Sequence, residues 1–264
     1  MIEAYIFIIG LFFGSFLNVL ADRLPFGRTL LGRSECESCK HSLIWKDLIP
    51  LISFIELKGK CRYCKASLSI GYPLSELFTG VIFLLTWSLS TAQFHDPIIH
   101  IIHLVIASIL IVMLLADLRY QIIPDEMQIG LLICAILRIY FLAPHIELPS
   151  VFDRVSIFGT PAIHGVIVML PLLLVFLFTK GRGMGFGDVK FTFILGFILG
   201  LWNGLTALYI AFLSGGLFGG VLLLTRKKGM KSKVPFGPFL ILGMYLMIFF
   251  DNDIMYWIMK AYGF

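Results

Sequence analysis

The stretch that decides the fold is residues 98–116, which read IIHIIHLVIASILIVMLLA and are followed at 117–126 by DLRYQIIPDE. The first stretch holds no Asp, Glu, Lys or Arg, and its length is close to the roughly 20 apolar residues that cross a bilayer as a helix. Lipid offers backbone N–H and C=O groups no partner, so such a segment must form its hydrogen bonds internally. The stretch therefore predicts a membrane-spanning helix that ends where the first charged residue, Asp117, appears.

The rest of the chain has the same apolar character. Of its 264 residues, 59% are hydrophobic and 14% are charged, whereas a soluble domain is about half apolar and about a quarter charged. The fold class that we predict is an all-α polytopic membrane protein with about eight transmembrane helices, surrounded by membrane lipids. The expected spans are 4–21, 74–92, 98–116, 122–142, 161–179, 189–204, 205–225 and 234–250.

The positions of Lys and Arg predict the orientation of these spans, because cytoplasmic loops carry an excess of both residues. With the N-terminus outside, the inside loops hold 18 of the 21 Lys and Arg residues. These loops are 22–73, 117–121, 180–190 and 226–233. We therefore expect the N-terminus outside and residues 22–73 in the cytoplasm. No stretch combines basic clusters with exposed aromatic residues, so we expect no nucleic-acid partner.

The predicted spans divide the chain into three parts: a first transmembrane helix at 1–21, a cytoplasmic subdomain at 22–73 and a membrane core at 74–264. No internal repeat is apparent. The roughly 50 residues of the subdomain are few for an independent hydrophobic core, which indicates that something else must hold it together.

The cysteines of the subdomain can provide this additional stabilisation. Cys36 and Cys39 form one CxxC pair, and Cys61 and Cys64 form a second. Four thiolates at this spacing form a closed tetrahedral site that is typical of structural zinc. Disulfides or free thiols are the alternative, but a reducing cytoplasm disfavours disulfides. The fifth cysteine, Cys134, lies within a predicted span and is expected to be a small buried hydrophobic residue.

Two carboxylates lie at the predicted membrane edge. Asp117 ends the third span, and Asp188 begins the sixth span after a glycine-rich stretch at 181–187. Two spans separate them, so both lie at the cytoplasmic face. If they meet, they share a proton and can act as acid and base. The alternative is that Asp188, and Asp125 in the fourth span, only cap helix N-termini.

Taken together and in order, these features resemble the bacterial type IV prepilin peptidase family, whose proteolytic core belongs to the GxGD class of intramembrane aspartyl proteases. The matching motifs cover nearly the whole chain. They are GSFLNV at 14–19, RLP at 23–25, DLIPLISF at 47–54, GKCRYC at 59–64, YPLSE at 72–76, IPD at 123–125, GFGDVK at 185–190 and PFGPF at 235–239. One departure is the first cysteine pair, CESC at 36–39, where the family often has Pro after the first Cys.

The resemblance implies an enzyme of the bacterial inner membrane that cleaves the basic leader of type IV prepilin or pseudopilin precursors. It marks Asp117 and Asp188 as the catalytic pair. The residues that it marks as supporting this motif are Asp125, Gly185, Gly187 and Lys190. Many members also methylate the new N-terminus with S-adenosylmethionine, an activity associated with the zinc-bearing region that this chain retains.

The sequence shows no recognisable pocket for a methyl donor. Asp47, Glu56 and Glu76 are the acidic residues that could contact one. Two other classes of function stay open beside the bifunctional enzyme: a peptidase without methyltransferase activity, and a non-enzymatic transporter or assembly protein. His100 and His103 lie three residues apart on one helix face, and a packed pair is a simpler interpretation than a metal site.

Overall fold

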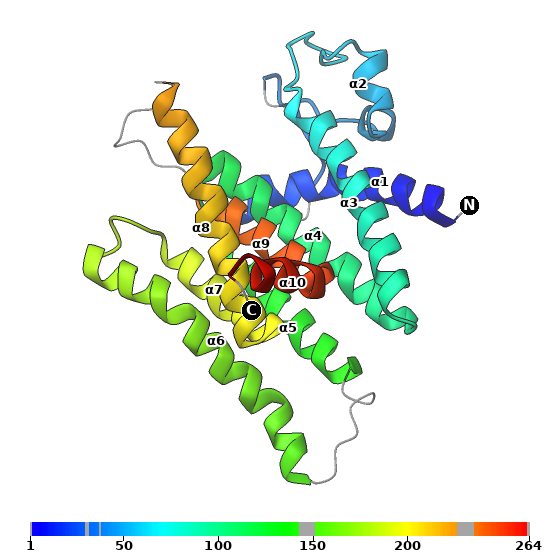
Figure 1. Cartoon of the computed structure of the whole chain (residues 1–264). Coiled ribbons are helices and arrows are strands. Elements are labelled where there is room, and N and C mark those ends of the chain that lie inside the picture. Colours follow the sequence, from blue (N-terminus) through cyan, green and yellow to red (C-terminus); the bar gives the residue numbers. More distant parts are fainter. Residues whose placement is uncertain (1, 30–31, 37, 143–150, 226–234, 263–264) are drawn as a thin grey trace. The chain divides into compact units, whose positions relative to one another are not determined.

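The computed structural model describes residues 2–29, 32–36, 38–142, 151–225 and 235–262 (Figure 1). These residues form helices joined by loops, without a regular strand. The α-helices are α1 (Ile2–Arg23), α2 (Ile52–Glu56), α3 (Gly71–Gln93), α4 (Pro97–Tyr120), α5 (Asp125–Leu142), α6 (Val151–Thr179), α7 (Phe186–Leu199), α8 (Leu201–Leu224), α9 (Gly237–Phe249) and α10 (Asp251–Tyr262). Two 3-10 turns, η1 (Leu24–Phe26) and η2 (Trp45–Leu48), lie between α1 and α2. The predicted all-α class is confirmed.

Each predicted span overlaps a helix, but the predicted number of eight spans is not confirmed. Among the described residues, five helices are long and apolar enough to cross a membrane. They are Ile2–Phe26, Gly71–Gln93, Pro97–Tyr120, Phe158–Thr179 and Leu201–Leu222. The pair α9 and α10, bent by 100°, makes a sixth if it counts as one span. Helix α7 has only 14 residues, and α5 carries charged residues in its first turn.

The predicted boundary between the sixth and seventh spans, at 204 and 205, is wrong. Gly200 adopts a φ of 80° and ends α7, while its N–H donates to the carbonyl of Gly196 at 3.0 Å. Helix α8 then begins at Leu201. A left-handed backbone conformation is accessible to glycine without a steric penalty, which explains why the break falls there. The predicted basic loop at 226–233 lies outside the described residues.

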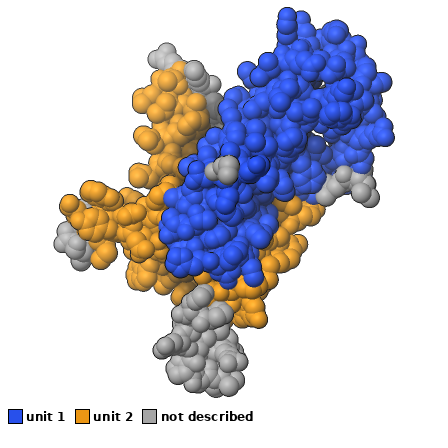
Figure 2. All heavy atoms as spheres, turned by 90° about the vertical axis from the view of Figure 1, so that its right-hand side faces the viewer, with its two compact units in different colours: residues 1–116 blue, residues 117–264 orange. Residues whose placement is uncertain are grey.

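The chain consists of two compact units, residues 1–116 and 117–264 (Figure 2). In the first unit α1 packs along α3 at close range. A Cβ atom at Gly14 would lie 2.7 Å from the Cα of Glu76, so only glycine fits there. Buried Asn18 donates to the carbonyl of Gly14 at 2.9 Å and to the hydroxyl of Ser75 at 2.7 Å. Small residues and interhelical hydrogen bonds of this kind hold membrane helices together.

The two histidines of α4 are packed inside the first unit. The hydroxyl of Ser90, from α3, lies 2.8 Å from Nδ1 of His100 and 2.9 Å from Nδ1 of His103. All three residues are buried. The rings of Trp87 and Phe94 contact the two imidazoles edge-on. This geometry agrees with the prediction of a packed pair.

In the second unit, α7 packs against α5, α6, α8 and α9. Its central position requires small residues at the contacts. A Cβ atom at Gly196 would lie 2.7 Å from the Cβ of Val168 on α6. The first turn of α7 carries Asp188, so this tight packing fixes the position of that carboxyl group.

Candidate active site and metal centre

Asp117 lies in the last turn of α4 and is 5% exposed. The backbone N–H of Gly237, the first residue of α9, interacts with its carboxyl group. Its Oδ2 atom has no hydrogen bond of normal geometry within the described part of the chain. A Cβ atom at position 237 would lie 2.6 Å from that oxygen. A buried acid with an unbonded oxygen is therefore held against a glycine backbone.

Asp188 is the third residue of α7 and is half-buried. The N–H of Gly185 interacts with its carboxyl group, as does the charge of Asp117, which acts on it by Coulomb repulsion. The structure thus brings the two predicted aspartates close enough to repel each other within one unit. The contact with the N–H of Gly185 also makes Asp188 a capping residue at the N-terminus of α7. The side chain of Asp188 therefore fits both interpretations from the sequence, a member of an acidic pair and a helix cap.

The chemical capacity of this pair follows from its burial. Two carboxyl groups that repel each other away from solvent resist simultaneous ionisation, and a pair of this kind can share one proton. A pair that shares one proton offers one basic and one acidic oxygen at the same time. This combination is what hydrolysis of an amide requires.

Asp125 and Lys190 form an ion pair that joins the first turn of α5 to the second turn of α7. Their side chains are 66% and 37% exposed, and the ammonium group of Lys190 also lies 5.6 Å above the ring of Phe186. The sequence alone does not identify a partner for Lys190, and the structure pairs it with Asp125. Asp125 is thus a surface residue with a cationic partner, unlike the buried Asp117.

The two glycines of the GFGD motif have different surroundings. A Cβ atom at Gly187 would lie 3.3 Å from the Cβ of Ile123, and the carbonyl of Gly187 accepts a hydrogen bond from Nε2 of Gln128 at 3.3 Å. Gly185 is extended, and a Cβ atom there would meet nothing closer than Oδ2 of Asp188 at 3.5 Å. Gly187 therefore serves close packing, whereas Gly185 leaves open space beside the carboxyl group.

Sequence reasoning missed two residues of this region. Gly237 was visible only as part of the PFGPF motif, and nothing in that motif indicates which side chain its N–H faces. Gln128 is a buried amide on an otherwise apolar stretch of α5, and its Oε1 atom has no hydrogen-bond partner within the described residues. A lone buried amide is a signal for a polar contact, but the sequence does not identify the partner.

The four predicted metal ligands come together in the first unit. The Sγ atoms of Cys36, Cys39, Cys61 and Cys64 all lie within 4.8 Å of one another. The Sγ atoms of Cys36 and Cys64 are 3.8 Å apart. A tetrahedral zinc site with Zn–S bonds of about 2.3 Å has S–S edges of about 3.8 Å. The donor set and its spacing therefore fit a zinc ion. Cys134, the fifth cysteine, is buried in α5, as predicted.

The two cysteine pairs sit on equivalent turns. The N–H of Lys40 donates to the carbonyl of Cys36 at 2.8 Å, and the N–H of Lys65 donates to that of Cys61 at 3.1 Å. The two lysines have φ values of 56° and 59°. An isolated antiparallel bridge closes each turn. The sequences of these turns are ECESCKHS at 35–42 and KCRYCKAS at 60–67. The chain therefore contains a short local repeat, contrary to the expectation from the sequence.

The thiols of this cluster differ in acidity. The N–H groups of Cys39 and Ser38 lower the pKa of the Cys36 thiol to about 7. The N–H of Ala66 acts in the same direction on Cys64, but loss of solvent and the three neighbouring sulfurs outweigh it and raise the pKa of Cys64 to about 11. Because a metal ion binds thiolates, its binding releases protons and stabilises the fold that brings the four sulfurs together.

Of the three acidic residues that could contact a methyl donor, Asp47 and Glu76 are bonded to other groups of the protein, whereas Glu56 is exposed. The Asp47 side chain is 3% exposed and lies 2.7 Å from Nε of Arg62. Glu76 is buried and accepts a hydrogen bond from the N–H of Leu51 at 2.9 Å. Glu56 is exposed at the end of α2.

Comparison with known proteins gave two matches to family models. Residues 8–89 match the bacterial peptidase A24 N-terminal domain, and residues 104–220 match the type IV leader peptidase family. No solved structure matches the chain.

Curated relatives match over most of their length. The chain is 28% identical to the prepilin leader peptidase/N-methyltransferase of Bacillus subtilis (strain 168), over 98% of each chain. It is 29% identical to the protein of that name from Aeromonas salmonicida (strain A449), over 97% of this chain and 93% of the relative. It is 31% identical to the one from Klebsiella pneumoniae, over 76% of this chain and 86% of the relative.

Proposed function

The chain belongs to the type IV leader peptidase family, and from this premise we propose that it is a bifunctional enzyme of the bacterial inner membrane. It hydrolyses the leader peptide of type IV prepilin or pseudopilin precursors and then methylates the new N-terminal amine. The names of its relatives support both activities.

The observation that carries the peptidase activity is the pairing of Asp117 and Asp188. One is buried with an unbonded oxygen, and the other lies within reach of its charge. The ionised member accepts a proton from water as the water oxygen attacks the scissile carbonyl, and the protonated member donates to the carbonyl oxygen. When the C–N bond breaks, the amine leaves with a proton from the pair. Gly185 leaves room beside Asp188 for an extended peptide.

The methyltransferase activity uses the amine that hydrolysis has released. Bound S-adenosylmethionine supplies a methyl group on a sulfonium centre. The amine nitrogen attacks the methyl carbon, the N–C bond forms as the C–S bond breaks, and the bonding electron pair remains on sulfur. The extra proton of the amine passes to solvent.

Zinc in the four-cysteine cluster has a structural role. A metal held by four thiolates has no open coordination position, so it holds Cys36, Cys39, Cys61 and Cys64 together and performs no chemistry. The subdomain at 22–73 then owes part of its folding free energy to the metal.

The proposed topology places the N-terminus outside and this subdomain in the cytoplasm. The basis is the distribution of Lys and Arg along the sequence. Asp117 and Asp188 then lie at the cytoplasmic membrane face. A precursor that inserts with its basic leader inside presents its cleavage site at the same face.

A transporter or an assembly protein is the alternative from another functional class. A transporter should show paired polar residues near the membrane midplane, whereas Asp117 and Asp188 are expected at one membrane edge. An assembly protein does not require two acidic side chains that repel each other at the end of α4 and the start of α7, and it should keep its function when one carboxyl group becomes an amide. The paired aspartates therefore favour the enzyme.

Prepilin cleavage by the full chain in membranes tests this proposal. Asp117→Asn and Asp188→Asn keep the shape of each side chain but remove its proton transfer, so we expect each to lower the cleavage rate by at least about 10³-fold. Asp253→Asn is the matched control, because it makes the same chemical change at an exposed residue of the same unit. Cleavage by both Asp117→Asn and Asp188→Asn at rates near that of the unchanged protein, with normal membrane insertion, would refute the peptidase assignment.

A further inference from the structure

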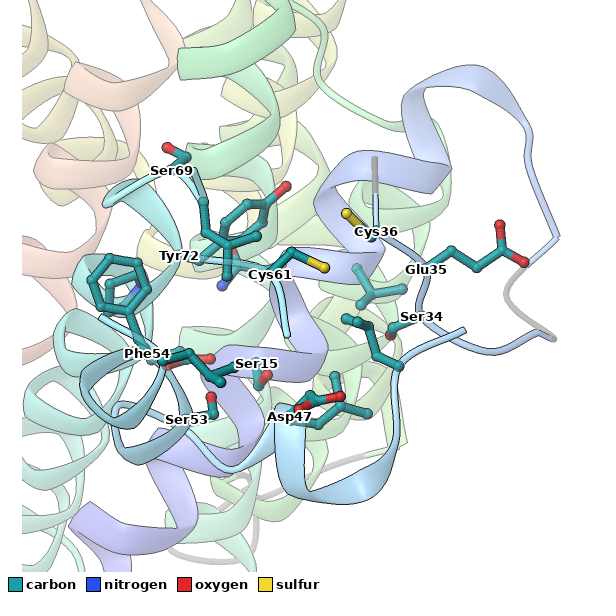
Figure 3. Close-up of a pocket in the computed structure, with 18 of the residues that line it drawn as sticks. Ser15, Ser34, Glu35, Cys36, Asp47, Ser53, Phe54, Cys61, Ser69 and Tyr72 are labelled. Atoms are coloured by element: carbon teal, nitrogen blue, oxygen red, sulfur yellow. The ribbon is translucent and has the colours of Figure 1, made fainter. Parts of the chain in front are cut away.

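Two buried side-chain oxygens of the second unit have no hydrogen-bond partner within the described part of the chain. They are Oδ2 of Asp117 and Oε1 of Gln128. Neither residue lines the cavity beside the four-cysteine cluster, which belongs to the first unit (Figure 3). A buried acceptor without a partner is destabilising, so a ligand that brings a donor to it gains affinity. The proposed hydrolysis uses the oxygen of Asp117 but not that of Gln128.

The orientation of the Gln128 amide is fixed by its neighbour. The residue is 4% exposed, and its Nε2 donates to the carbonyl of Gly187 at 3.3 Å. A carbonyl oxygen only accepts, so the NH₂ end of the amide must face Gly187. Turning the amide over would bring two acceptors together. Oε1 therefore points away from Gly187 and keeps its full capacity to accept a hydrogen bond.

Gln128 lies beside the aspartate pair. Its Nε2 is 3.7 Å from the position of a Cβ atom at Gly187, the residue directly before Asp188. The side chain of Ile123 contacts the same glycine, because its Cβ is 3.3 Å from that position. Gln128 is thus anchored to the backbone that carries one of the two carboxyl groups.

The same isoleucine extends toward the other carboxyl group. Cδ1 of Ile123 lies 3.3 Å from the position of a Cβ atom at Gly237, and Oδ2 of Asp117 lies 2.6 Å from that position. The two unbonded oxygens therefore belong to residues that surround one apolar side chain. A peptide held beside the aspartate pair would pass within reach of the amide.

An extended peptide brings the donors that such a site lacks. Each of its residues except proline carries a backbone N–H, which needs an acceptor when it leaves water. We propose that Oε1 of Gln128 accepts the backbone N–H of a precursor residue next to the scissile bond, an inference that rests on the peptidase half of the proposed function. Gln128 then binds the peptide through Oε1 and the Gly187 carbonyl through Nε2, which aligns the scissile bond with Asp188.

The first test is the kcat/KM of leader cleavage by the purified full chain. Gln128→Met keeps the length of the side chain but has no amide, so we expect about a tenfold loss. Asn252→Leu is the matched control, because it removes an exposed amide from the same unit. Methylation of a pre-cleaved pilin and membrane insertion verify that Gln128→Met is folded.

A second measurement separates contact with the substrate from a structural role. Synthetic precursor peptides carry an ester oxygen in place of one backbone N–H at a time, with the scissile amide left intact. For the unchanged protein, we expect one ester next to the scissile bond to lower kcat/KM about tenfold. That ester should cost Gln128→Met less than twofold, because its partner is already absent. Esters at other positions should affect both proteins equally.

Gln128→Glu gives a further comparison that does not depend on Gln128→Met being folded. A glutamate keeps an acceptor oxygen at the same distance from the backbone. The ester that discriminates against the unchanged protein should therefore also lower cleavage by Gln128→Glu, relative to the all-amide peptide. A Gln128→Glu protein that cleaves the two peptides equally well would contradict the proposed contact.

The outcomes separate two kinds of failure. If every ester lowers cleavage by the unchanged protein and by Gln128→Met to the same extent, Gln128 only supports Gly187 or binds water, and this inference is overturned. The proposed peptidase activity still stands in that case, because cleavage itself has been observed. If the unchanged protein cleaves no precursor, the peptidase half of the proposed function fails, and the inference fails with it.

Discussion

Gly237→Ala is the smallest change that should disable the peptidase site. A Cβ atom there would lie 2.6 Å from Oδ2 of Asp117 and 3.3 Å from Cδ1 of Ile123. Ordinary van der Waals contact begins near 3.4 Å, so the carboxyl group or the start of α9 must move by about 0.8 Å. A misplacement of about 1 Å at a catalytic group costs on the order of 10²-fold in rate. We therefore expect cleavage to fall about 10- to 100-fold.

The assay for this variant is the kcat/KM of prepilin cleavage by the purified protein, with methylation of a pre-cleaved pilin measured in parallel. Methylation should be unchanged, because the change is remote in sequence from the cysteine subdomain and belongs to the other unit. Gly219→Ala is the control, since a Cβ atom there would meet nothing within 4 Å. Unchanged cleavage by Gly237→Ala would show that the position of Asp117 does not limit the reaction.

Three further predictions concern other parts of the chain. Cys36→Ser should lose the bound zinc, measured by metal analysis, and at least about 90% of the methylation, while cleavage persists. Ser90→Ala should lower the free energy of unfolding by about 1–3 kcal/mol in a detergent melt, because two buried imidazoles lose a shared partner, with both activities unchanged. Lys190→Met should reduce cleavage no more than about fivefold, since an exposed ion pair with Asp125 contributes at most about 1 kcal/mol.

Each of these three predictions has an outcome that would contradict it, and the cysteine variant also has a matched control. Cys134→Ser should retain the zinc, because this thiol lies outside the cluster. Zinc bound by Cys36→Ser as tightly as by the unchanged protein would rule out a four-cysteine ligand set. Loss of either activity in Ser90→Ala would assign the histidine pair a functional role. A loss of cleavage in Lys190→Met as large as in Asp188→Asn would make this lysine part of the catalytic machinery.

The sequence predicted the helices well because a membrane helix requires a long apolar run, and such a run can be recognised in a single sequence. It predicted their ends less well. Gly196, Gly200 and Gly204 are equally spaced, and nothing in the chain distinguishes the one that takes the left-handed conformation and ends α7. Hydropathy also does not reveal that α7 is only 14 residues long, since the apolar run continues into α8.

The candidate site was predictable in part, for a related reason. Counting the spans expected from the sequence predicts that Asp117 and Asp188 share one membrane face, and the CxxC spacing predicts a cluster that the structure contains. The contact between Gly237 and Asp117 was not predictable, because it depends on how α9 packs beside the end of α4. The pairing of Lys190 with Asp125 was not predictable for the same reason: several acidic residues are expected near one membrane edge, and only the packing of α5 and α7 selects one.

The chemistry of the two proposed reactions gives the most stringent comparison between variants. The α-amine that is methylated does not exist until the peptide bond has been broken, and its pKa near 8 leaves part of it neutral and nucleophilic at physiological pH. A precursor therefore reports both reactions, whereas a pre-cleaved pilin reports methylation alone. Asp117→Asn should fail on the precursor and methylate the pre-cleaved pilin, while Cys36→Ser should cleave the precursor and methylate neither. A single shared active site cannot give both patterns, because any variant that disables it would lose cleavage and methylation together.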